Sequence, residues 1–385
     1  MITLLLIIAI ALALFIGILN LQIPGLWKFG LAVIEMAILS HIFTIRYGIE
    51  NQMGLLLFRS KKGLQIIEKL AKRAEIFKFL SDAGAFMCYG LLSIVIMRKN
   101  ISLKSALCGL VLLTVLYLIV APNVVPFLAS VLKINIVEKT QASVQQNTSS
   151  ALFLPIATFM MYIGGLFIVL VLSIIWYAVL VLMALSSSIF GGTDAIAKTE
   201  PGGTLLLPGV TIPFFEGVLA IVIIMAVHEG AHAILARIGR IKVLSSGIVL
   251  FGIIPVGAFV EPDEKQLEKM EKTKQTRVLV AGSSSNLIVS IIAFVLFAML
   301  AITANKFSLM SVSYLAPIIK FLYITLGLTY TLNFVVGTIN LLPLPFFDGY
   351  RIIDANLENR VIVRGLMYLT LAAFIMNFIP WLFKP

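Results

Sequence analysis

Long apolar runs, each close to the length of a membrane-spanning helix, dominate the pattern of this 385-residue chain. A helix needs about 20 apolar residues to cross the hydrocarbon core of a bilayer. We therefore expect a span in each of nine runs: Ile2–Leu21, Leu26–Ile45, Phe79–Met97, Leu103–Ala121, Ala151–Leu185, the run that ends at Val227, Val278–Thr303, Tyr314–Thr338 and Gly365–Phe383. The fifth run is long for one upright span and short for two, which predicts one tilted or extended helix.

The polar segments between these runs follow other patterns. Residues 46–78 are rich in Lys and Arg, and apolar residues recur at helical spacing from Leu64 to Phe77. This pattern predicts an amphipathic helix on the inner leaflet. Ile, Val and Gly residues recur in short alternating runs over residues 242–260, and residues 253–260 are typical of an extended strand with a Gly kink.

A Gly- and Pro-rich linker, residues 190–213, divides the chain. We predict an accessory transmembrane half, residues 1–200, which includes the basic amphipathic segment 46–78, and a catalytic transmembrane core, residues 201–385. No internal repeat is visible, which weighs against transporter folds that are built from paired halves.

The composition agrees with this pattern. The chain is 60% hydrophobic and 12% charged, whereas soluble domains are about 45–50% apolar and about 25% charged. The predicted fold class is an all-α polytopic membrane protein, with about 8–9 transmembrane helices and a short β-strand or hairpin insertion. Both cysteines, Cys88 and Cys108, fall inside apolar runs, so no disulfide framework is expected.

The net charge of +11 comes from basic residues in the loops, which favours anionic membrane lipid rather than nucleic acid as a partner. With nine spans and the N-terminus inside, the inner segments hold eight, two, eight and three Lys or Arg residues, together 21 of 29. They are 46–78, Lys133 with Lys139, 237–277, and Arg351 with Arg360 and Arg364. This distribution predicts a multi-pass protein of the cell membrane, with the 228–232 segment towards the cytoplasm. It indicates no particular oligomeric state.

His228-Glu229-Gly230-Ala231-His232 closes the apolar run that begins at Phe214, and it contains two of the chain's three histidines. Residues four apart on a helix project from one face, so His228 and His232 can bind one metal ion. Glu229 projects about 100° away, beside the metal, where a general base for a metal-bound water belongs. A chance match on a soluble helix is disfavoured, because ionisable side chains at membrane depth are costly and mark functional sites.

A catalytic zinc ion usually has a third protein ligand. The candidate is Asp348, which precedes Gly349 at the end of a Pro-interrupted segment in the apolar C-terminal half. Irregular backbone at membrane depth lies against protein or a wet cavity. A plain Asp-Gly turn at the membrane surface is the alternative interpretation.

These motifs resemble the site-2 proteases, which are intramembrane zinc metalloproteases. His228–His232 fits their His-Glu-x-x-His. Asn340-x-x-Pro343-x-x-x-x-Asp348-Gly349 fits their second signature, whose Asp is the third ligand. Ala281–Asn286 is similar to their Ala-Gly-Pro-x-x-Asn, and Pro255–Val260 to their Pro-x-Gly-Gly strand. The resemblance covers residues 211–357. This sequence departs from the pattern at Ser283, Tyr350, Pro345 and Ala258, which changes no ligand and no base.

The resemblance implies hydrolysis of a peptide bond in or near a transmembrane helix of a membrane-protein substrate, that is, regulated intramembrane proteolysis. One Zn²⁺ per chain would be bound by His228, His232 and Asp348, with Glu229 as the general base. Asn340 is the candidate for holding the oxyanion or, as an equal alternative, for bonding the interrupted backbone near Pro343. Asn286 is expected to form a helix-packing hydrogen bond.

Two other functions are compatible with these residues. A prenyl-protein-type membrane zinc protease also carries His-Glu-x-x-His, but takes its third ligand from a Glu on a later helix, where Glu358 is available. A proton- or ion-coupled transporter would use His228, Glu229 and Asp348 as a relay. Bound zinc separates the two proteases from the transporter.

Overall fold

The computed structural model describes residues 2–383 apart from residues 24, 53, 99, 133–149, 204, 205, 207 and 210. Lys133 and Lys139, which contribute to the predicted topology, lie outside the described residues.

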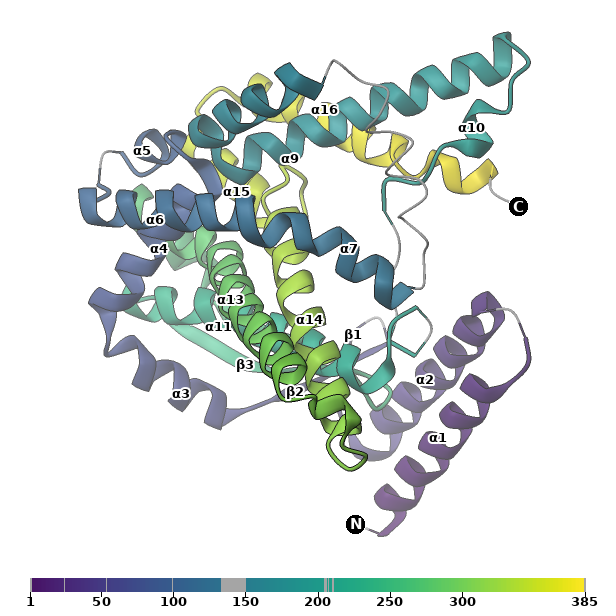
Figure 1. Cartoon of the computed structure of the whole chain (residues 1–385). Helices are drawn as coiled ribbons and strands as arrows, with labels where there is room; N and C mark the ends of the chain where they lie inside the picture. Colours follow the sequence, from purple (N-terminus) through teal and green to yellow (C-terminus); the bar gives the residue numbers. More distant parts are fainter. Residues whose placement is uncertain are drawn as a thin grey trace.

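Helices make up most of the described chain (Figure 1). They are α1 (Ile2–Asn20), α2 (Gly25–Tyr47), α3 (Lys61–Ala71), α4 (Ala74–Tyr89), α5 (Leu92–Ile96), α6 (Leu103–Val115), α7 (Ala121–Leu132), α9 (Ser150–Phe190), α10 (Ala195–Lys198), α11 (Phe214–Ile238), α12 (Glu264–Glu268), α13 (Lys272–Lys306), α14 (Ala316–Ile339), α15 (Asp348–Asn356) and α16 (Arg360–Met376). A π-helical turn, Leu116–Val120, joins α6 to α7 without a break.

Seven helices in the described part of the chain are long and apolar enough to cross a membrane. They cover Gly30–Tyr47, Leu103–Leu132, Thr158–Phe190, Phe214–Ile238, Lys272–Lys306, Ala316–Ile339 and Arg360–Phe383. The predicted polytopic, mostly helical membrane fold is confirmed. Of the other two expected spans, the first is the shorter apolar helix Thr3–Ile18, and the one at 79–97 is broken into α4 and α5.

The break between α4 and α5 faces a kink in α9. Gly90 and Gly165 both have a positive φ, 54° and 62°, which a residue with a side chain rarely adopts. A Cβ on Gly90 would overlap the backbone near Tyr162, and one on Gly165 would overlap the backbone of Cys88. The Leu91 amide donates to the Tyr162 carbonyl at 3.0 Å. The expected single helix over 151–185 is therefore two helical pieces that bend where α4 ends.

A four-stranded antiparallel sheet has the order β1-β2-β3-β4. Its strands are β1 (Glu50–Gln52), β2 (Leu55–Arg59), β3 (Val243–Phe251) and β4 (Ile254–Pro262). The hairpin after the His-Glu-x-x-His helix is as expected. The β1–β2 hairpin was not predicted, because the pattern of residues 46–78 indicates one basic amphipathic segment. That pattern also predicted one helix over 64–77, which is wrong: the helix ends at Ala71 and α4 begins at Ala74.

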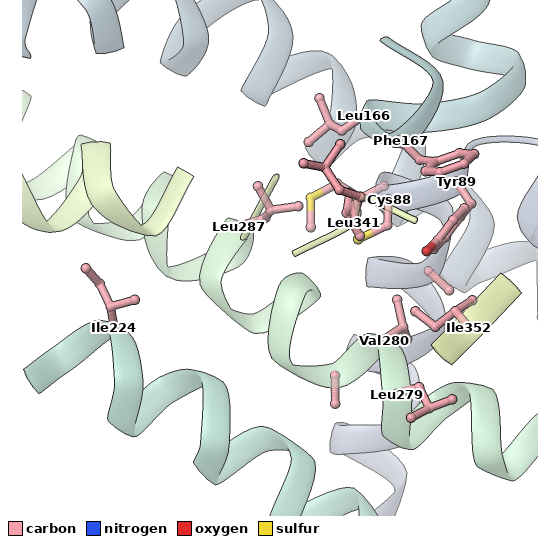
Figure 2. Close-up of a cluster of buried hydrophobic side chains, with 14 of the residues drawn as sticks. Cys88, Tyr89, Leu166, Phe167, Ile224, Leu279, Val280, Leu287, Leu341 and Ile352 are labelled. Atoms are coloured by element: carbon pink, nitrogen blue, oxygen red, sulfur yellow. The ribbon is translucent and has the colours of Figure 1, made fainter. Parts of the chain in front are cut away.

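The N-terminal helices pack directly on the core that carries the His-Glu-x-x-His motif. In Figure 2, buried side chains from α4, α9, α11, α13 and α15 meet in one cluster, with Leu341 from the segment after α14 among them. Arg277 forms a bidentate ion pair with Asp82 of α4, at 2.6 and 2.9 Å. Gly84 of α4 lies so close to Ser284 of α13 that a Cβ there would overlap it. α1 and α2 instead share a separate, small cluster with β2.

Candidate metal centre

Helix α11 carries both histidines on the face that it turns towards α13. The His228 ring is 7% exposed, and its Nε2 lies 3.2 Å from Nε2 of His232. Ala220 and Ile224 are also buried on α11, so the same apolar face that packs this helix into the molecule presents the histidines. The two imidazoles therefore converge as the four-residue spacing predicts.

Asp348 reaches this pair from the irregular segment between α14 and α15. The Asn340 carbonyl, at the end of α14, accepts the Gly349 amide at 2.7 Å, and Leu341 and Leu342 are fully buried. A Cβ on Gly349 would overlap the Leu341 carbonyl, so only glycine permits this close approach. The Asp-Gly pair is thus part of a buried connection that places Asp348 at the first position of α15.

The three side chains form a nearly equilateral set of donor atoms. Asp348 Oδ2 lies 3.2 Å from Nε2 of His228 and 3.2 Å from Nε2 of His232. Ligand atoms about 2.0–2.1 Å from a tetrahedral zinc ion lie roughly 3.3 Å from one another. Two imidazole nitrogens and one carboxylate oxygen are zinc ligands of the catalytic type. This set therefore fits a zinc ion in both chemistry and spacing, and it is the cluster found among the described His, Cys, Asp and Glu residues.

The remaining ring nitrogens of both histidines contact helix α13. Nδ1 of His232 donates to the Val278 carbonyl at 2.7 Å, which leaves Nε2 with a free lone pair. The Asn286 amide lies 3.2 Å from Nδ1 of His228, and its Oδ1 has no partner among the described residues. The atom at this distance is Nδ2; an amide rotated by 180° would place Oδ1 there, accept the Nδ1 proton and leave Nε2 free for a metal as well. The expected helix-packing role of Asn286 thus extends to orienting His228.

Gly282 gives the histidines the room that they need. A Cβ at this position of α13 would overlap Nε2 of both His228 and His232. Gly282 belongs to the Ala281–Asn286 segment. This motif therefore contributes two things to the site: Gly282 leaves space for both imidazole rings, and Asn286 contacts the His228 ring. The sequence alone associated the segment with the family, but did not show what the glycine faces.

A pocket of about 250 Å³ opens on the three donor atoms. Glu229, Asn340 and the β4 residues Val260 and Pro262 line it together with the two histidines and Asp348. Asn340 Nδ2 donates to the Val336 carbonyl at 3.1 Å, which occupies one of its two N–H groups. The structure thus brings all five predicted site residues to one pocket, and both interpretations of Asn340 remain compatible with its position.

The pocket is also lined by two charged residues that the sequence did not single out as site residues, Glu264 and Arg351. Arg351 follows Asp348 by one turn of α15, and it pairs with Glu264 of α12 at 2.7 Å. The sequence offered one signal for Arg351, its i+3 spacing from Asp348. Glu358, the alternative third ligand, is exposed after α15 and does not belong to the cluster.

Comparison with known proteins supports these observations for the C-terminal part of the chain. Residues 216–379 match the model of Peptidase family M50. The resemblance to the site-2 proteases is therefore confirmed over these residues, which contain the whole cluster. M50 proteins are membrane metallopeptidases, and their usual metal is zinc.

A curated relative, "Uncharacterized protein MJ0971" of Methanocaldococcus jannaschii, is 34% identical over 114 residues. The match covers 30% of this chain and 30% of that protein. No solved structure matches the chain.

Proposed function

We propose that this protein is a zinc metalloendopeptidase that hydrolyses a peptide bond in or near a transmembrane helix of a membrane-protein substrate. The observation that carries the proposal is the set of three donor atoms, 3.2 Å apart, at a pocket that Glu229 also lines. Two of these donors and Glu229 lie on α11, a helix long and apolar enough to span a membrane. Residues of the M50 match supply all of these groups.

His228, His232 and Asp348 would hold the zinc ion. Bound zinc supplies Lewis acidity, which lowers the pKa of water to about 7 and polarises a carbonyl. Glu229 accepts the proton of the attacking water and passes it to the leaving amine. The free N–H of Asn340 donates to the oxygen of the scissile carbonyl as negative charge develops there.

The edge of β4 offers a place for the substrate backbone. β4 is the last strand of the sheet, and β3 pairs with one side of it only. A transmembrane helix must unwind before its peptide bonds can be attacked. The unwound segment would add to β4 as a strand, next to the pocket that Val260 and Pro262 line. The distribution of basic loops favours a pocket that faces the cytoplasm of the cell membrane, and regulated intramembrane proteolysis would then release a cytoplasmic fragment.

The test measures zinc content and cleavage of a reconstituted transmembrane substrate in the same preparations. We expect one zinc ion per chain in the wild type, a sharp loss in His232→Ala and in Asp348→Ala, and full zinc without cleavage in Glu229→Gln. Glu358→Gln is the matched acid control and should keep both zinc and cleavage. Zinc retained in Asp348→Ala but lost in Glu358→Gln would establish the prenyl-protease arrangement. Ion transport by a metal-free wild type would overturn the protease assignment.

A further inference from the structure

Helix α3 carries an exposed basic and apolar surface that the proposed active site does not use. Its inward side is built from Leu64, Ile67 and Ala71, and Ile67 is 7% exposed. On the other side Ile66 is 59% exposed and Leu70 is 37% exposed. Exposed apolar side chains on an amphipathic helix that is already packed indicate a second contact.

Basic residues surround these exposed side chains. Lys62, Ile66 and Leu70 follow one another four residues apart, and Lys69 lies three residues after Ile66, so they share one face of the helix. In or directly after α3 lie five cations, and none has an ion pair among the described residues: Lys61, Lys62, Lys69, Lys72 and Arg73. The one acid of the helix, Glu68, pairs with Arg237 at 3.2 Å.

That ion pair also places α3 beside the C-terminal end of α11. Arg237 is the next-to-last residue of α11, whose candidate span ends at Ile238. α3 is therefore attached where the catalytic helix leaves the apolar layer, at the level of lipid headgroups. The start of α3 is fastened to the sheet: the Ser60 amide donates to the Ser246 carbonyl at 2.7 Å, and Ser246 Oγ donates to the Ser60 carbonyl at 3.3 Å.

We propose that the exposed face of α3, formed by Lys62, Ile66, Lys69 and Leu70, docks on anionic lipid headgroups, with Ile66 and Leu70 inserted between the acyl chains. The lysine stems cover apolar surface while their ammonium groups reach the headgroup phosphates. The charge complementarity and the position at the end of the α11 span both favour a lipid surface over a soluble partner. Because α3 is bonded to β3 and α11, this contact holds the sheet beside the pocket at a fixed depth.

The test uses the full-length protein in vesicles, with an environment-sensitive fluorophore on Ile66→Cys. Cys108→Ser removes the other reactive thiol, and Cys88 is fully buried. Quenching by brominated phosphatidylglycerol is compared with quenching by brominated phosphatidylcholine. Because each of the two lysines on this face favours an anionic surface by about 1 kcal/mol, we expect a preference of about 30-fold for the anionic lipid.

Matched substitutions identify the residues that carry this preference. Lys62→Gln with Lys69→Gln should reduce the preference to near one. Lys265→Gln with Lys269→Gln changes two exposed lysines, four residues apart, in and directly after the acidic helix α12, and should leave the preference unchanged. In the unsubstituted labelled protein, 0.5 M salt should weaken the preference, because screening acts on exposed charges.

Equal quenching by both lipids would overturn the proposal, because the face would then touch lipid without recognising charge. Absence of quenching by either lipid would also overturn it and would favour an acidic protein partner on this face. Neither outcome involves zinc or hydrolysis, so the protease function is tested separately.

Discussion

The residues of the M50 match and the residues before them differ in what their sequences predict: the first contain recognisable motifs, and the second do not. Residues 216–379 carry every motif that predicted chemistry, and each motif either lines one pocket or, as Ala281–Asn286 does, contacts the histidines there. The residues before position 216 carry no such motif. They nevertheless supply strands β1 and β2 of the sheet and Asp82, which forms the ion pair with Arg277. Local spacing thus predicts which side chains meet at the candidate site. Contacts between residues far apart in the chain determine where those residues sit.

Removal of the ion pair between Asp82 and Arg277 is expected to have the largest effect, and it tests whether the N-terminal residues hold the helices of the site in place. The two side chains are only 9% and 19% exposed. Asp82→Ala leaves a buried, unpaired guanidinium at the start of α13, the helix that orients both histidines. We expect the free energy of unfolding to fall by about 3–5 kcal/mol, measured by denaturant unfolding in detergent.

Glu75→Ala is the control for that substitution, since it removes the acid of an exposed pair with Lys78. It should cost no more than about 1 kcal/mol. Equal effects of the two substitutions would mean that the N-terminal helices are not held to the core through Arg277.

Two glycines inside the M50 residues allow the site itself to be tested without removing a ligand. Gly282→Ala places a methyl group against Nε2 of both histidines, whereas a Cβ on Gly230 has nothing within 4 Å. We expect zinc affinity to fall on the order of 100-fold in Gly282→Ala, an effect comparable to the loss of a group that orients a metal ligand. Titration with a competing chelator measures this affinity.

Gly230→Ala should bind zinc as the wild type does. It should also be about 0.5–1 kcal/mol more stable, because alanine loses less backbone entropy in a helix. Normal zinc affinity in Gly282→Ala would show that the two histidines do not bind metal in the observed arrangement.

Substitution of Arg59 is expected to have the smallest effect on stability. It tests the exposed contacts that join the strands of the sheet. Its guanidinium bonds Glu50, Glu261 and Ser245, which joins the N-terminal hairpin to β3 and β4. Hydrogen bonding to Arg59 lowers the pKa of Glu50 below its usual 4.5. We expect a small decrease in melting temperature for Arg59→Gln at pH 7.

The pH dependence of that decrease follows from the sign of the shift. A carboxylate whose pKa is lowered by folding stabilises the folded state above its unfolded pKa, and this contribution is lost as the pH falls through the folded pKa. The difference between Arg59→Gln and wild type should therefore shrink below pH 4.5. Lys104→Gln, on an exposed lysine of α6, should show no such pH dependence.

The sequence predicted the membrane class, the β3–β4 hairpin and the pair His228 and His232 with Glu229 from local periodicity and spacing. Asp348 and Asn340, which meet them at the pocket, were predicted with the help of the resemblance to the site-2 proteases.

The sequence did not predict the β1–β2 hairpin, since Leu56 becomes a strand residue only by pairing with Leu250, far along the chain. It also did not predict the break at Gly90, because an apolar run of span length conceals a turn that another helix stabilises. The charged pair Glu264–Arg351 was missed for the same reason: each residue alone is an ordinary surface charge.

The contact between Gly90 and Gly165 has a consequence for biosynthesis. The two bends meet backbone to backbone, and the Leu91 amide finds its acceptor only in the Tyr162 carbonyl. When α4 leaves the ribosome, its partner has not yet been made, so the amide must stay hydrated or bonded elsewhere until residues 162–165 enter the membrane. The bend after α4 can therefore form fully only once α9 has been synthesised. Because α9 precedes α13 in the chain, this bend can be complete before α13 packs against α4.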